Sequence, residues 1–264
     1  MRKLAEKLKE IKNKDKIGFM GHVVAGYPDL ETSYEAAMGI SEGGADFLEI
    51  QFPFSDPFAD GPTIENASVV SLKNGIKISD CFDLAEKIAK NCESSVLIMT
   101  YGNIAFSYGV KNFVKKSEEI GVDGFIIPDI PPENDEGLSV LCEKNDLSMI
   151  YLAAPGNSAE RIEYLSEKGN GFIYAVARTG ITGKKTEITG EVTEWLNFVR
   201  KNSKLPIAVG FGINSSNQIK NLKPYCDIAI AGSYFVREIT ECHKNGDDVR
   251  ETLKTKTVQL LNVE

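Results

Sequence analysis

Residues 47–62 read FLEIQFPFSDPFADGP, and this stretch decides how the rest of the chain is interpreted. It begins as an apolar run typical of a buried strand and passes directly into a loop that holds Asp56 and Asp60 among prolines. Proline fixes φ and lacks a backbone N–H group, so the loop is stiff and cannot extend a sheet. Glu49 stands near the end of the apolar run. Carboxylates at the end of a strand predict a place for acid–base chemistry.

The composition is that of an acidic globular protein. The 264 residues are 42% hydrophobic and 26% charged, and the net charge is −8. An acidic balance disfavours nucleic acid and anionic membranes as partners, because both bind basic surfaces. No apolar run approaches the roughly 18 residues of a membrane span, and the charged N-terminus lacks the core of a signal peptide. We therefore expect a cytoplasmic protein with no membrane or nucleic-acid partner.

The histidines and cysteines limit the metal sites and disulfides that the chain can form. The chain has two histidines, which excludes a His-rich metal site, so no metal is expected. Its five cysteines are scattered without a C-x-x-C pair. This pattern favours reduced thiols over a disulfide framework, as in a cytosolic protein.

Short apolar runs alternate with segments of helical periodicity along the whole chain. Strands are expected at 17–24, 45–52, 95–100, 124–127, 148–153, 171–176, 206–209 and 227–231. Unbroken apolar strands are typical of a parallel sheet buried on both faces. Eight strand–helix units in this length predict one (β/α)₈ TIM barrel over residues 1–264, a single domain with an extra N-terminal helix at 2–13. An open doubly wound sheet would instead carry G-x-G-x-x-G after its first strand, where this chain has GYPD at 26–29.

The ends of the last strands carry a signal for phosphate binding. In such barrels the active site lies at the carboxyl ends of the strands, and phosphate commonly binds after strands 7 and 8. GFGI at 210–213 and AGSYF at 231–235 follow these two strands. Glycine lets backbone N–H groups approach an anion, and a helical turn opening at AGSYF adds a favourable dipole. The long polar loop at 178–190 is either a mobile lid or an ordinary surface loop.

Four candidate residues differ in how far the pattern defines their roles. Glu49 is flanked by apolar residues, and burial of this kind favours the neutral form of a carboxyl group, as proton transfer requires. Asp60 either accepts a hydrogen bond from a substrate or caps the next helix, and Asp56 is typical of a turn. His22, with apolar neighbours, is more typical of a packed core histidine than of a catalytic one.

Beyond these, the sequence resembles a known family. E-x-x-x-P-F-S-D-P-x-A-D-G-P at 49–62, followed by TIENA, is similar to the signature of the tryptophan synthase alpha subunit family. The likeness continues in order through AGYPDLETS at 25–33, MTYGN at 99–103, GVDGFIIPDIPPEN at 121–134, TGITG at 179–183, VGFGI at 209–213 and AGS at 231–233. It therefore spans nearly the whole chain.

The resemblance implies a carbon–carbon lyase of tryptophan biosynthesis. Members of this family cleave indole-3-glycerol phosphate to indole and glyceraldehyde 3-phosphate by a retro-aldol reaction, without a cofactor of their own. By this likeness Glu49 is the general acid and base, Asp60 binds the indole N–H group, and Tyr174 assists at the glycerol side. The implied substrate-binding residues are Tyr174, Met99, Ile127, Leu152, Thr182, Gly183, Gly210, Phe211, Gly212, Gly232 and Ser233. The implied partner is a beta subunit that carries pyridoxal phosphate, in an alpha2-beta2 tetramer.

The chain departs from the family pattern at several positions. Gln51 stands where the family usually has a small residue, His22 where phenylalanine is common, and Tyr27 where it usually has Asp. Lys184 and Lys185 replace the residues often seen after the TGITG-like segment. Two alternatives therefore stay open: a stand-alone indole-releasing lyase, and a catalytically weak barrel kept as an allosteric subunit.

Overall fold

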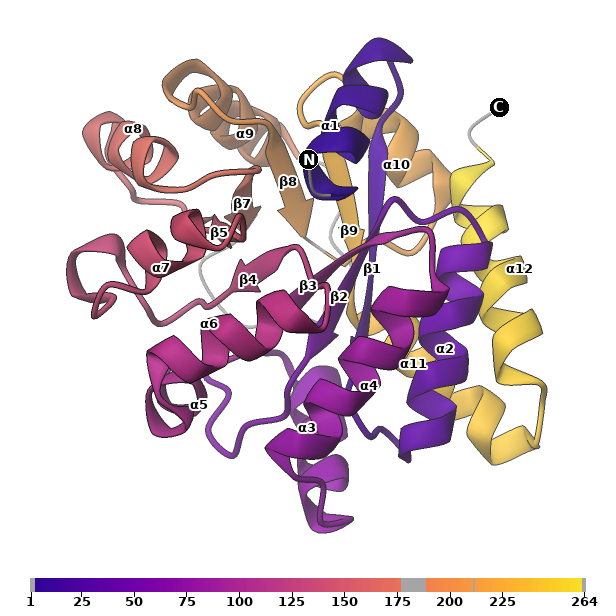
Figure 1. The fold of residues 1–264 in the computed structure, drawn as a ribbon. Helices are drawn as coiled ribbons and strands as arrows, with labels where there is room; N and C mark the ends of the chain where they lie inside the picture. Colours follow the sequence, from indigo (N-terminus) through magenta and orange to yellow (C-terminus); the bar gives the residue numbers. More distant parts are fainter. Residues whose placement is uncertain (1–2, 177–188, 211, 263–264) are drawn as a thin grey trace.

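The computed structural model describes residues 3–176, 189–210 and 212–262. Its strands form one parallel sheet, in the order β5-β4-β3-β2-β1-β9-β8-β7-β6. Their bounds are β1 Gly18–Val24, β2 Phe47–Gln51, β3 Ser95–Met99, β4 Gly124–Ile126, β5 Ser148–Ile150, β6 Leu152–Ala153, β7 Ile173–Val176, β8 Ile207–Gly210 and β9 Ile228–Ala231. β5 pairs with β4 while β6 pairs with β7, and only Tyr151 separates β5 from β6. The two ends of the sheet thus meet in one stretch of chain, which confirms the predicted (β/α)₈ barrel (Figure 1).

Helices surround this sheet. Their bounds are α1 Lys3–Asn13, α2 Leu30–Glu42, α3 Pro62–Lys73, α4 Ile78–Asn91, α5 Gly102–Tyr108, α6 Val110–Glu119, α7 Leu138–Lys144, α8 Ala159–Lys168, α9 Gly190–Asn202, α10 Ser216–Leu222, α11 Ser233–Asn245 and α12 Val249–Leu261, with a short 3-10 helix at Pro132–Asn134. Most agree with the expected segments. The sequence pattern predicts a single helix at 132–145, but the structure has two, because Gly137 adopts φ +82° between the 3-10 helix and α7. α11 is a full helix rather than a short turn.

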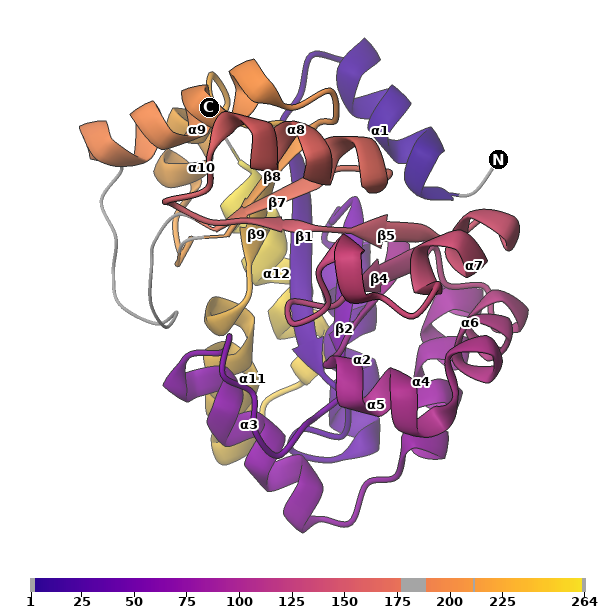
Figure 2. The same ribbon diagram turned by 90° about the vertical axis from the view of Figure 1, so that its left-hand side faces the viewer.

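The core has two parts, which the alternation of side chains along each strand separates. In β2, Leu48 and Ile50 point outward and pack with the helices, while Phe47 belongs to a second cluster inside the barrel. Helix α1 lies across the amino end of the barrel (Figure 2) and adds Leu4 and Ile11 to that inner cluster. Apolar side chains close this end, whereas the buried Glu49 and Gln51 lie toward the carboxyl end of β2.

Candidate active site

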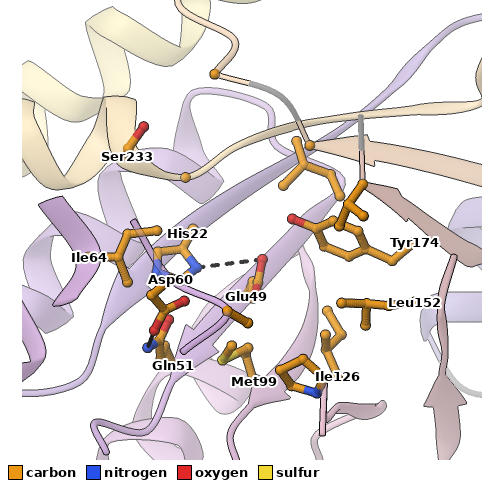
Figure 3. Close-up of a pocket in the computed structure, with 17 residues that line it drawn as sticks. His22, Glu49, Gln51, Asp60, Ile64, Met99, Ile126, Leu152, Tyr174 and Ser233 are labelled. Atoms are coloured by element: carbon orange, nitrogen blue, oxygen red, sulfur yellow. Dashed lines mark hydrogen bonds and ion pairs between the residues drawn. The ribbon is translucent and has the colours of Figure 1, made fainter. Parts of the chain in front are cut away.

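A pocket opens at the carboxyl ends of the strands (Figure 3). Its lining residues come from most strands of the barrel and from the loops that follow them. They are His22, Glu49, Gln51, Ala59, Asp60, Ile64, Met99, Ile126, Pro128, Leu152, Tyr174, Val176, Gly210, Gly212, Ile230, Gly232 and Ser233. The pocket therefore lies where a barrel of this kind carries its chemistry.

Glu49 lies on β2 and points into the barrel. The residue is 5% exposed, and its Oε2 atom lies 3.5 Å from Nδ1 of His22. The Cα atoms of these two residues are partners in the β1–β2 ladder, so both side chains leave the same face of the sheet. Nε2 of His22 is buried without a hydrogen-bond partner. An imidazole is thus built into the wall beside the candidate acid and base.

Asp60 reaches the same pocket from the loop that joins β2 to α3. Nε2 of Gln51 donates a hydrogen bond to its Oδ2 atom at 2.6 Å. The loop is also fixed by Tyr101, whose hydroxyl accepts a hydrogen bond from the backbone N–H of Ala59 at 3.2 Å. The ring of Tyr101 stacks on Phe54 with 5.2 Å between centroids. The loop is therefore held from two sides, by Gln51 at the end of β2 and by Tyr101 just before α5.

Burial changes the acidity of Asp60. It raises the pKa of the carboxyl group to about 6, because a charge is poorly solvated there. The hydrogen bond from Gln51 and the charge of His22 lower this pKa, Glu49 raises it, and the Tyr101 hydroxyl lowers it. A carboxyl group with such a pKa can change its charge within the range in which enzymes work.

Tyr174 of β7 faces the two carboxylates from across the pocket (Figure 3). Burial raises the pKa of its hydroxyl well above the ordinary value, and the charges of Glu49 and Asp60 raise it further. The hydroxyl therefore stays protonated and is available as a hydrogen-bond donor. A Cβ atom on Gly210 would come within 2.6 Å of this hydroxyl, so glycine is needed next to the ring.

The end of the pocket at α11 suits an anion. Gly232 is the residue before α11, and Ser233 is its first residue. Gly212, with φ +80°, lies in the loop after β8, the strand that pairs with β9. A helix N-terminus presents free N–H groups and a partial positive charge. Because no Lys or Arg lines the described part of the pocket, binding of an anion there would depend on backbone N–H groups and this dipole.

An apolar wall completes the pocket opposite α11. Met99, Leu152 and Ile126 form it. Ile127, which the sequence led us to expect here, instead packs in the outer cluster between barrel and helices. The reason is the alternation of neighbouring side chains: Ile126 points inward, so the next residue points outward.

The pocket unites most of the predicted site residues. Glu49, Asp60, Met99, Leu152, Tyr174, Gly210, Gly212, Gly232 and Ser233 all line it. Thr182, Gly183 and Phe211 lie outside the described residues, as do Lys184 and Lys185. His22 and Gln51 were seen in the sequence as departures from the family pattern, but not as site residues. His22 lies two residues after the inward-facing Met20, and Gln51 lies two residues after Glu49. Side chains two residues apart on a strand point to the same face, and this spacing would have identified both.

Three other residues have structural roles. Both carboxylate oxygens of Asp129 accept the backbone N–H of Gly102, at 2.8 and 3.0 Å, so this side chain anchors α5. Asp56 is exposed and accepts a hydrogen bond from Ser55. The hydroxyl of Tyr27 lies 2.8 Å from that of Thr240, which ties the β1 loop to α11.

The described part of the chain has neither a metal-binding cluster nor a membrane-spanning helix. There, no three side chains of His, Cys, Asp or Glu are placed to hold a metal ion together. Over the same residues, no helix combines the length and the apolar character that crossing a bilayer requires.

The fold and the pocket together define a class of protein. A (β/α)₈ barrel with two buried carboxylates, an apolar wall and a helix N-terminus at the carboxyl ends of its strands has the architecture of a barrel enzyme. Comparison with known proteins gives the family. The family model described as tryptophan synthase alpha chain matches residues 8–263, and this chain belongs to that family.

Relatives and solved structures agree with this assignment. The tryptophan synthase alpha chain of Helicobacter hepaticus is 45% identical over 228 residues, covering 84% of this chain and 85% of the relative. That of Methanosarcina mazei is 41% identical over 259 residues, covering 98% and 93%. The crystal structure of tryptophan synthase subunit alpha from Legionella pneumophila superposes with a TM-score of 0.90 at 29% identity, covering 100% of this chain and 98% of the other.

Proposed function

We propose that Glu49 and Asp60 carry out the reaction of this family in this chain. Tryptophan synthase alpha chains are lyases that cleave indole-3-glycerol phosphate to indole and glyceraldehyde 3-phosphate, a step of tryptophan biosynthesis. The observation that supports these roles is the placement of both carboxylates in one pocket, between an apolar wall and the N-terminus of α11. A planar indole ring fits the apolar wall and a phosphate fits the helix end.

Glu49 transfers two protons in turn. As a carboxylic acid it donates a proton to the indole carbon that bears the glycerol chain, and positive charge develops at the ring nitrogen. As a carboxylate it then removes the proton of the neighbouring hydroxyl group. The electrons of that O–H bond form the aldehyde carbonyl, and those of the breaking C–C bond return to the indole ring. Glu49 is buried in the wall of the pocket, where its carboxyl group can reach both the ring carbon and the hydroxyl of a bound substrate.

Asp60 stabilises the charged intermediate. Its carboxylate accepts a hydrogen bond from the indole N–H group, which strengthens as the ring becomes positive. The carboxylate must be ionised for this, so activity is expected to rise as the pH increases through the pKa of about 6. The hydroxyl of Tyr174, which stays protonated, donates a hydrogen bond to an oxygen of the glycerol chain.

The remaining substrate contacts follow from the shape of the pocket. Met99 and Leu152, with Ile126 in place of Ile127, pack on the indole ring. The phosphate is bound by the backbone around Gly212, Gly232 and Ser233, next to Gly210. Thr182, Gly183 and Phe211 are retained as proposed substrate contacts on the family likeness alone.

The proposed roles are tested by replacing Glu49 with Gln, which keeps the shape of the side chain but can neither donate nor accept a proton in the reaction. We expect release of glyceraldehyde 3-phosphate to fall by about 10²- to 10⁴-fold. The circular dichroism spectrum should stay unchanged. Asp56→Asn, an exposed carboxylate in the same loop, is the control and should keep full activity. Near-normal turnover of Glu49→Gln would rule out the proton-transfer role.

The partner and the setting of the chain are also part of the proposal. We propose that the chain uses no cofactor of its own and binds a pyridoxal-phosphate beta subunit in an alpha2-beta2 tetramer. Phe58, which is 68% exposed on the Asp60 loop, supports a contact surface beside the pocket. The five buried cysteines without disulfides support a cytoplasmic location, and the single sheet supports one domain.

One assay separates this proposal from its two alternatives. Cleavage of indole-3-glycerol phosphate is measured with the chain alone and then with its beta subunit. A large rise in rate on mixing supports the alpha-subunit role. A high rate that mixing leaves unchanged favours a stand-alone lyase. Binding of the substrate without glyceraldehyde 3-phosphate in either assay favours the allosteric subunit.

A further inference from the structure

Gln51 and Asp60 form the shortest side-chain contact inside the described part of the pocket. The Nε2 atom of Gln51 lies 2.6 Å from Oδ2 of Asp60. Gln51 is fully buried and Asp60 is 6% exposed. A hydrogen bond to a charged acceptor that is shielded from water is among the stronger ones in proteins.

The two residues differ in how firmly the fold holds them. Gln51 is the last residue of β2, and its Cα atom pairs with Val24 of β1 and Met99 of β3. Its Nε2 atom also lies 3.4 Å from the hydroxyl of Ser68 in α3. Asp60, in contrast, lies nine residues further on, in a loop. A side chain on a strand that is paired on both sides is therefore in a position to hold a side chain on a loop.

The amide of Gln51 makes this contact in one orientation. Its Oε1 atom is buried and has no hydrogen-bond partner. A glutamine amide carries an oxygen acceptor and an NH₂ donor, and a flip of the amide exchanges the places of the two groups. The carboxylate of Asp60 can only accept when ionised, so it selects the orientation in which the NH₂ group faces it.

We propose that Gln51 is a positioning residue of this site, which fixes the Asp60 carboxylate at the pocket wall in the orientation that receives the N–H group of the indole ring. The contact between the two side chains is a property of the free protein. Its consequence for the reaction rests on the proposed role of Asp60.

The same contact affects the ionisation of Asp60. The groups that act on this carboxyl are Gln51, His22 and Tyr101, which lower its pKa, and Glu49, which raises it with burial. A donor bound to the ionised form stabilises that form. Loss of the Gln51 donor therefore raises the pKa of Asp60, and a higher pH is then needed to ionise it.

The test replaces Gln51 with Met, which has a similar length and no N–H group. The titration of Asp60 is followed in the free protein by NMR of the labelled carboxyl carbon, and the pH dependence of kcat/KM is measured with indole-3-glycerol phosphate. We expect both midpoints to move upward by roughly one pH unit. Ser71→Ala is the control: it removes another buried 2.6 Å hydrogen bond, to the carbonyl of Ala25, and should move neither.

Each result bears on a different statement. An unchanged Asp60 titration in Gln51→Met would overturn the positioning role, whatever the activity. A titration that moves while the kcat/KM profile stays fixed would uphold the link between the two side chains and overturn the role of Asp60 in the reaction. Movement of both supports both.

The unsubstituted protein gives a second measurement, which needs no folded variant. The side-chain amide signal of Gln51 should shift with the same midpoint as the carboxyl carbon of Asp60, because the amide follows the charge of its acceptor. An amide signal that stays constant through that titration would contradict the proposal.

Discussion

Nδ1 of His22 lies 3.5 Å from Oε2 of Glu49, and the two residues are direct partners in the β1–β2 ladder. The imidazole is almost fully buried, and its other nitrogen, Nε2, has no hydrogen-bond partner. A buried polar atom without a partner lowers the free energy of unfolding, by about 1 to 3 kcal/mol in typical cases. The position of His22 is therefore unfavourable for stability, while it places a polar group against the proposed acid and base.

Replacing His22 with Phe should accordingly have opposite effects on activity and on stability. The planar ring is kept, but the contact with Glu49 is lost, so we expect kcat to fall roughly tenfold. The free energy of unfolding should rise by about 1 kcal/mol, because the unpaired nitrogen is removed. Steady-state kinetics and urea denaturation of the same preparation measure the two effects. A loss of stability together with unchanged kcat would show that His22 is only a packing residue.

A second prediction concerns the close approach of Gly210 and Tyr174. A Cβ atom at position 210 would lie 2.6 Å from the Tyr174 hydroxyl and 3.2 Å from its ring. Gly210→Ala should therefore displace the ring and lower kcat/KM by about tenfold or more.

A double variant tests whether the alanine acts through the Tyr174 hydroxyl. In the Gly210→Ala, Tyr174→Phe double variant the hydroxyl is absent, so the two effects should be less than additive. Purely additive losses would mean that the alanine acts elsewhere. Tyr174→Phe alone supplies the reference rate.

The barrel could be predicted from the sequence because each strand is a continuous apolar run. The points at which a predicted strand or helix is divided in two could not be predicted. Tyr151 divides the fifth strand because its first half pairs with β4 and its second half with β7, and this depends on neighbours distant in the sequence. Gly137, the residue before α7, has a positive φ that separates this helix from the 3-10 helix, and the surrounding helical pattern concealed it.

The site shows the same division. The placement of Glu49 followed from its position on an apolar strand. The prediction of Ile127 as a wall residue was wrong by one position, since Ile126 forms the wall. A shift of one position along a strand reverses the face that a side chain occupies. The contact of Gln51 with Asp60 joins a strand to a loop and has no fixed sequence spacing. His22 was interpreted as a core residue because its neighbours are apolar, yet those neighbours point to the opposite face.

A third prediction tests the helix packing around the barrel. α2 and α12 pack closely at Gly39, where a Cβ atom would overlap the backbone carbonyl of Arg250. Overpacking against backbone costs about 1 to 3 kcal/mol, which exceeds the gain in helix propensity at this site. Gly39→Ala should therefore lower the midpoint of urea denaturation. Gly190→Ala, which has open space at the first turn of α9, is the matched control and should leave it unchanged or slightly higher.

The last prediction concerns the cost of keeping Asp60 buried. Its pKa is about 6 in the folded protein, against about 3.9 for an unfolded chain. The folded state thus binds this proton more tightly, so the stability that Asp60 contributes is fully present below pH 4 and is lost as the pH rises through 6.

Asp60→Asn cannot ionise and should escape this loss. We expect the variant to be more stable than the unsubstituted protein at pH 8, by on the order of 1 to 3 kcal/mol, and equally stable near pH 4. Urea denaturation at several pH values measures the difference, and Asp56→Asn, at an exposed position, should show none. Parallel curves for Asp60→Asn and the unsubstituted protein would mean that the carboxylate is better solvated than its burial indicates. A difference that grows with pH would show that the fold gives up stability at neutral pH to keep an ionised carboxylate where the indole nitrogen is expected to bind.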